Sequence, residues 1–108
     1  MGDILIVDDE PNNLRVLYNL LINDGYQVQA ARDGQTALDA VANSLPALIL
    51  LDIKMPGMNG YEVCRQLKQN PVTRDVPVIF ISALSQIDDI VTAFKMGGVD
   101  YITKPFKF

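Results

Sequence analysis

The sequence has no histidine, no tryptophan and a single cysteine, Cys64. Without histidine, imidazole catalysis and histidine metal sites are excluded, and one cysteine can form neither an internal disulfide nor a cysteine-rich zinc site. Positive charge is also scarce, because nine lysines and arginines stand against thirteen acidic residues and give a formal net charge of −4. This argues against direct binding of nucleic acid or anionic membranes, since both need clustered positive charge. A functional site in this chain would therefore use carboxylate, hydroxyl and lysine side chains.

Signals for export and for membrane insertion are lacking too. The N-terminus has neither the basic segment nor the long apolar stretch of a secretory signal, and no apolar run is long enough to span a bilayer. The 108 residues suffice for one domain but not for two, and a hydrophobic content of 49% is typical of a globular protein. We therefore expect a single cytoplasmic domain without a membrane partner.

Short apolar runs alternate with stretches of helical period along the whole chain. Three of the runs are continuously apolar, which is typical of strands buried on both faces of a parallel sheet, and two more polar runs suit positions nearer a sheet edge. The five strand candidates lie at 4–7, 27–30, 48–51, 78–81 and 100–103. The apolar stripes of four helices lie within 14–22, 37–45, 61–67 and 87–94. The alternation predicts an α/β, doubly wound domain with a parallel sheet.

Polar residues follow the strand candidates at the point where each strand ends. Asp8 and Asp9 follow the first run, Asp52 the third, Ser82 the fourth and Lys104 the fifth. Ligands of open parallel sheets bind at the carboxyl ends of the strands, so we expect these side chains to converge on one rim. Three carboxylates that close repel one another unless a positive charge lies among them. A divalent cation such as Mg2+, which prefers oxygen ligands, is the natural candidate.

Four segments occur in a characteristic order, and each lies at a strand end. They are ILIVDDEP at 4–11, LLDIKMPGMNG at 50–60, ISA at 81–83 and GVDYITKPF at 98–106. With these motifs the chain resembles, from Ile4 to Phe106, a receiver domain of the two-component response regulators. The resemblance implies the five-stranded, flavodoxin-like sheet order 2-1-3-4-5 of chemotaxis-type receivers, with residues 1–108 forming one receiver domain.

The resemblance implies a phosphorylation site. Asp52 would be the phosphoacceptor, whose carboxylate attacks a phosphoryl group and becomes an aspartyl phosphate. Asp9, Asp52 and the backbone carbonyl of Lys54 would bind Mg2+ directly, with Mn2+ as an alternative, and Asp8 would reach the ion through water. Lys104 would neutralise charge on the phosphoryl oxygens.

The resemblance also implies a switch. Ser82 would hydrogen-bond the phosphoryl group, Tyr101 would be the switch aromatic, and a cis peptide bond between Lys104 and Pro105 would aim the lysine at the site. The responding surface would comprise residues 83–85, the predicted helix at about 86–96 and Tyr101. Two simpler interpretations stay open, because hydroxyls are common at strand ends and Tyr101 could be a half-buried strand aromatic.

By this resemblance the domain is regulatory and catalyses only its own phosphorylation and autodephosphorylation. Its partner would be a His-phosphorylated sensor kinase or phosphotransfer protein. The alternatives are a docking module that works without phosphate and a small phosphatase with an aspartate nucleophile. Such phosphatases usually carry a second acid two residues after the nucleophile, where this chain has Lys54.

The sequence stops at Lys107 and Phe108, where a receiver normally enters its fifth helix. We therefore expect a C-terminally incomplete receiver that belongs to a longer protein, with the output domain on the missing part. The loss of that helix would expose apolar surface that a partner or a second copy would cover, so a homodimer stays open.

Overall fold

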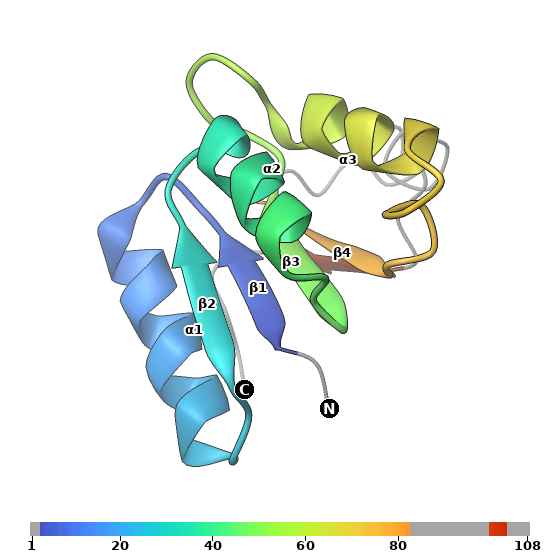
Figure 1. Ribbon diagram of the computed structural model, residues 1–108. Helices are drawn as coiled ribbons and strands as arrows, with labels where there is room; N and C mark the ends of the chain where they lie inside the picture. Colours follow the sequence, from blue (N-terminus) through green and yellow to red (C-terminus); the bar gives the residue numbers. More distant parts are fainter. Residues whose placement is uncertain (1–2, 83–99, 104–108) are drawn as a thin grey trace.

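The computed structural model describes residues 3–82 and 100–103 of the chain (Figure 1). Its strands are β1 (Ile4–Val7), β2 (Val28–Ala31), β3 (Leu48–Asp52), β4 (Val78–Ser82) and β5 (Asp100–Thr103). Its helices are α1 (Pro11–Asn23), α2 (Gly34–Asn43) and α3 (Gly60–Gln69). All five predicted strands are present within one residue of their expected bounds. The predicted fourth helix at about 86–96 lies outside the described residues.

The strands form one parallel sheet in the order β2-β1-β3-β4-β5. The predicted α/β class and the order of the first four strands are confirmed, and the backbone of β5 pairs with the outer side of β4. Val7 of β1 pairs with Leu51 of β3, and Asp52 pairs with Ile81 of β4. The carboxyl ends of these three central strands therefore lie level at one edge of the sheet.

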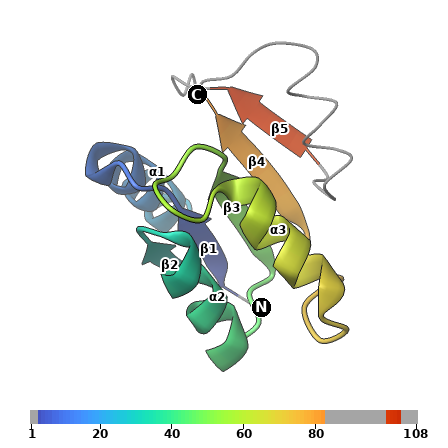
Figure 2. The ribbon, with the colours of Figure 1, turned by 90° about the horizontal axis from the view of Figure 1, so that it is seen from above.

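Helices cover both faces of the sheet, with α1 on one face and α2 and α3 on the other (Figure 2). Successive residues of a strand point to opposite faces, and this alternation divides the core into two clusters. Ile4 and Ile6 of β1 pack with Leu14 and Leu17 of α1, whereas Leu5 and its neighbours on the other face pack under α2 and α3. Both faces are apolar, which explains the continuous apolar runs in the sequence.

In two helices the apolar stripe predicted from the sequence includes residues that are not buried in the structure. Tyr18 and Ile22 of α1 are each 40% exposed, because they lie on the flank of the buried stripe formed by Leu14 and Leu17. The stripe of α2 was expected to reach Leu45, but the helix ends at Asn43 and Leu45 is exposed. Pro46 disfavours helical backbone at the residue before it, so the helix ends earlier than the apolar pattern suggests.

Each helix begins at a side chain that accepts a backbone hydrogen bond. Glu10 accepts from the amide of Asn12, Asp33 from that of Thr36, and Asn59 from that of Glu62. These caps satisfy amides that have no partner within the helix. In residues 3–82, none of the helices combines the length and the hydropathy that a membrane span requires.

Candidate functional site

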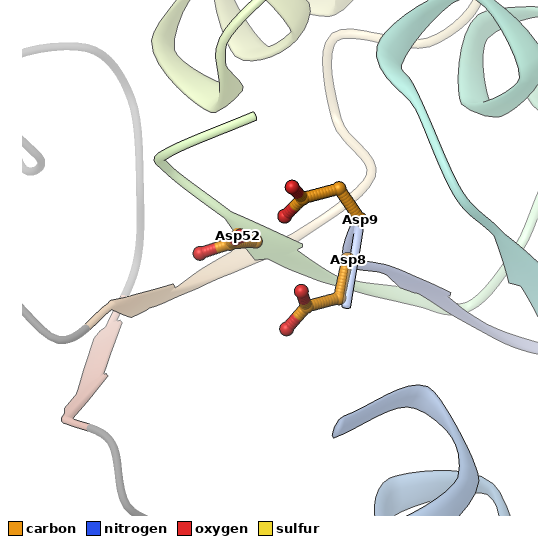
Figure 3. Close-up of side chains that lie close together, drawn as sticks. All are labelled: Asp8, Asp9 and Asp52. Carbon is orange, nitrogen blue, oxygen red and sulfur yellow. The ribbon is translucent and has the colours of Figure 1, made fainter. Parts of the chain in front are cut away.

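Three carboxylates gather at the carboxyl ends of β1 and β3 (Figure 3). Asp8 and Asp9 follow β1, Asp52 is the last residue of β3, and the two strands are neighbours. One carboxylate oxygen of each residue lies within 4.8 Å of the others. Asp8 is 1% exposed and Asp52 is 3% exposed, whereas Asp9 is only partly buried. The sheet thus brings together the three acidic residues that the sequence predicted.

Asp8 is held in place by the backbone around it. Its amide donates to the carbonyl of Ala31 in the neighbouring strand (3.1 Å), and its Oδ1 accepts from the amide of Glu10 (3.0 Å). The second bond is a local turn of the kind that aspartate favours. The Glu10 carboxylate accepts from the Asn12 amide and so lies at the start of α1. The chain therefore turns from β1 into α1 with the Asp8 carboxylate fixed at the rim of the sheet.

The loop between β3 and α3 begins beside Asp52 and is closed at its base. The amide of Ile53 donates to the carbonyl of Ile81 in β4 (3.2 Å), and the amide of Gly60 donates to the carbonyl of Ile53 (2.8 Å). Ile53 and Met55 are buried, while Lys54 between them is exposed. The backbone of Lys54 is thus held between two buried anchors, directly after the acidic cluster.

The donor set suits a divalent cation. It consists of carboxylate oxygens only, and two of the three carboxylates are almost completely buried. Burying like charges together is costly unless a positive charge compensates them. Small hard cations such as Mg2+ and Mn2+ take oxygen ligands and are usually held by one or two carboxylates together with water. The residues present therefore fit such an ion.

The remaining predicted site residues are described only in part. The backbone of Ser82 ends β4 one residue after Ile81, the partner of Asp52, so Ser82 lies at the same edge of the sheet. Tyr101 lies in β5 opposite Phe80. Lys104, its peptide bond to Pro105 and the expected responding surface at 83–96 lie outside the described residues.

Sequence reasoning missed Gly60, the first residue of α3. A Cβ atom at this position would lie 2.2 Å from the carbonyl oxygen of Asp52. Glycine is unfavourable inside a helix, because its backbone loses more conformational freedom than that of other residues. Its occurrence at the first helical position, directly after the capping residue Asn59, is the signal that could have revealed the close approach.

An aromatic pair, one ring buried and one partly buried, connects α3 to the sheet. The rings of Tyr61 and Phe80 meet edge to face, with centroids 5.4 Å apart. Phe80 is completely buried in β4, and Cys64 of α3 is also completely buried. Burial raises the pKa of the Cys64 thiol. These contacts fix α3, and with it the end of the loop that follows Asp52.

Comparison with known proteins agrees with this geometry. Residues 4–108 match the model of the response regulator receiver domain. The response regulator PleD of Caulobacter vibrioides is 47% identical over 102 residues, which are 94% of this chain and 22% of that protein. The chain thus spans less than a quarter of that relative's length.

Solved structures show the same similarity. The signal receiver domain of a signal transduction histidine kinase from Syntrophus aciditrophicus is 41% identical, with a TM-score of 0.89 over 99% of this chain and 81% of that chain. The receiver domain of NtrX from Brucella abortus is 35% identical, with a TM-score of 0.87 over 97% of this chain and 88% of that chain.

Proposed function

The chain belongs to the family of response regulator receiver domains, and from that premise we propose that Asp52 is its phosphoacceptor. An oxygen of the Asp52 carboxylate would attack the phosphorus of a phosphohistidine on a sensor kinase or phosphotransfer protein. The bond between phosphorus and the histidine nitrogen would break, so that the donor histidine is the leaving group and an aspartyl phosphate forms on Asp52. The observation that carries the proposal is the gathering of Asp8, Asp9 and Asp52 at one rim of the sheet.

The same residues would hold Mg2+. We propose that Asp9, Asp52 and the backbone carbonyl of Lys54 bind the ion directly and that Asp8 does so through water. When bound, the ion neutralises negative charge on the phosphoryl group and on the carboxylates. The chain's own contribution is orientation, since the Glu10 amide holds Asp8 and the closed base of the loop holds Lys54 beside Asp52.

Three further residues would serve the phosphorylated state. Lys104 would bind a phosphoryl oxygen through its ammonium group, and Ser82 would donate its hydroxyl to the same group. Tyr101 would change its packing as Ser82 moves, so that phosphorylation shifts the population between two arrangements of residues 83–96. The backbone position of Ser82 at the end of β4, and that of Tyr101 in the adjacent strand β5, two residues before Thr103, the partner of Ser82, support these assignments.

We propose that residues 1–108 act as the regulatory receiver of a longer cytoplasmic protein rather than as an enzyme on an external substrate. The support is the difference in length from PleD, of which the matching segment is only 22%. The output activity would then lie in another part of that protein, and a partner that prefers the phosphorylated arrangement would read the switch.

The test is phosphorylation of the chain with acetyl phosphate, with and without Mg2+. We expect an adduct that requires Mg2+, withstands acid and is released by hydroxylamine. Asp52→Asn should abolish it, whereas Asp39→Asn, which changes an exposed acid on α2, should leave it intact.

Absence of an adduct in the presence of Mg2+ would contradict the proposal and would favour a docking module that works without phosphate. Turnover of many phosphoesters would instead favour a phosphatase.

A further inference from the structure

Gly60 lies directly on the backbone that carries Asp52. A Cβ atom at position 60 would lie 2.2 Å from the Asp52 carbonyl oxygen and 2.9 Å from the Cα atom of Ile53. Both are backbone atoms, so no change of side-chain rotamer could relieve the overlap. Gly57, in the same loop, differs from Gly60, because no described atom lies within 4 Å of a Cβ built there. The close approach is therefore particular to Gly60.

The close approach closes the loop. The Gly60 amide donates to the Ile53 carbonyl at 2.8 Å, and Asn59 caps α3 immediately before it. The loop that contains Lys54 starts at Ile53, and the hydrogen bond from Gly60 brings its other end back to the same residue.

A side chain at position 60 would have to displace either α3 or the peptide between Asp52 and Ile53. Helix α3 packs against the core through the buried side chains of Val63, Cys64 and Leu67. Tyr61 packs against Phe80 of β4. Because the helix is anchored along its length, much of the displacement would fall on residues 52–54.

A second glycine contact holds the same loop from the side of α2. A Cβ atom at Gly34 would lie 2.8 Å from Cγ2 of Val63 and 3.0 Å from Sδ of Met58. Met58 belongs to the loop, and its sulfur also lies 3.8 Å from Nε2 of Gln66 in α3. The loop is thus fixed between the start of α2 and the end of β3.

We propose that Gly60 is a positioning residue of the phosphoacceptor site. Because it has no side chain, α3 can begin on the peptide that follows Asp52, and this sets the Asp52 carboxylate and the Lys54 carbonyl at the spacing that a divalent cation needs. The inference rests on the proposed function, since it assumes that the ion and the phosphoryl group bind at Asp52.

The experiment measures the Mg2+ dissociation constant of the full chain by NMR titration, together with its circular dichroism and thermal unfolding. Gly60→Ala should raise the dissociation constant roughly 10-fold or more, as loss of a group that orients metal ligands commonly does. Gly57→Asn is the matched control, because asparagine tolerates the positive φ of 73° at that position. It should change the constant by less than about 2-fold, well below the effect expected for an orienting group.

Val41→Ala tests for a purely structural role, because it removes buried methyl groups in α2 about two helical turns after Gly34. This variant should lose stability and keep its Mg2+ affinity. A folded Gly60→Ala variant that binds Mg2+ within about 2-fold of the wild type would overturn the inference.

If Gly60→Ala does not fold, the Mg2+ dissociation constant of Gly34→Ala tests the inference instead. This substitution should shift the loop through Met58 and weaken Mg2+ binding to a smaller extent, and a folded Gly34→Ala variant with wild-type affinity would overturn the inference. Failure of the wild type itself to bind Mg2+ would instead contradict the proposed function.

Discussion

The amide of Glu10 donates a hydrogen bond of 3.0 Å to the carboxylate of Asp8, two residues earlier in the chain. Asp8 is 1% exposed, so this bond orients a buried anion toward Asp9 and Asp52. The three carboxyl groups therefore keep a fixed arrangement although they lie close enough to repel one another when ionised. This balance between fixed geometry and repulsion leads to the first two predictions.

Asp8→Asn should affect stability and ion binding in opposite directions. Asparagine keeps an oxygen that can accept from the Glu10 amide but removes one charge, so the melting temperature without Mg2+ should rise because repulsion falls. The Mg2+ dissociation constant should increase roughly 10-fold, since Asp8 orients bound water in the proposed site. Thermal unfolding and titration measure the two effects. A lower melting temperature together with unchanged Mg2+ affinity would contradict both parts.

Mg2+ should stabilise the wild-type fold, and a chelator should reverse the effect. An ion that binds only the folded state adds about 1.4 kcal/mol when its free concentration is ten times its dissociation constant. The melting temperature should therefore rise with Mg2+ concentration. Asp52→Asn should reduce the rise, and Asp39→Asn should not. An equal rise in all three proteins would indicate a general salt effect.

The Cys64 thiol should be unreactive in the folded protein. Burial raises its pKa, because the thiolate loses its hydration in the core, so little of the reactive anion is present at pH 8. A thiol reagent should label the native chain slowly and the denatured chain quickly. Equal labelling rates in the two states would show that the interior opens far more often than the packing of α3 indicates.

Asp33 should make stability depend on pH in the acid range. The hydrogen bond from the Thr36 amide lowers the pKa of this carboxyl group in the folded state. The stabilisation is therefore present above the ordinary pKa of the unfolded chain and is lost as the pH falls through the lower folded value. The difference in melting temperature between the wild type and Asp33→Ala should shrink below about pH 4.

Asn59→Ala provides the comparison for that experiment. Asn59 caps α3 in the same way but does not titrate, so its loss should cost about 1 kcal/mol independently of pH. A constant difference for Asp33→Ala as well would show that the charge of its carboxylate does not contribute to the cap.

The sequence allowed the sheet to be predicted more closely than the helices. Continuous apolar runs of β-branched and leucine residues such as Ile4–Val7 are typical of a strand covered on both faces, and the short length of the run favours a strand over a helix. A helical stripe constrains its ends less, because apolar residues on its flank, such as Ile22, continue the pattern while they stay exposed. Leu45 likewise continues the apolar pattern of α2 although the helix ends at Asn43, before Pro46.

Part of the site could be predicted and part could not. Asp8, Asp9 and Asp52 follow strands of a parallel sheet, and strand ends meet at one edge, so their convergence follows from topology. Gly60 depends instead on how closely a helix approaches the backbone of a strand, which composition and periodicity do not encode. The hydrogen bond between Glu10 and Asp8 likewise depends on the backbone dihedral angles of one turn.

The neighbouring positions of β1 and β3 also have a consequence for the order of events during synthesis. Asp8 and Asp9 leave the ribosome long before Asp52, and α1, β2 and α2 lie between them in the chain. Until β3 has emerged and paired with β1, the nascent chain holds only part of the cluster. The three carboxylates of the candidate ion site therefore come together only when β3 pairs with β1, while α3, β4 and β5 are still to follow in the chain.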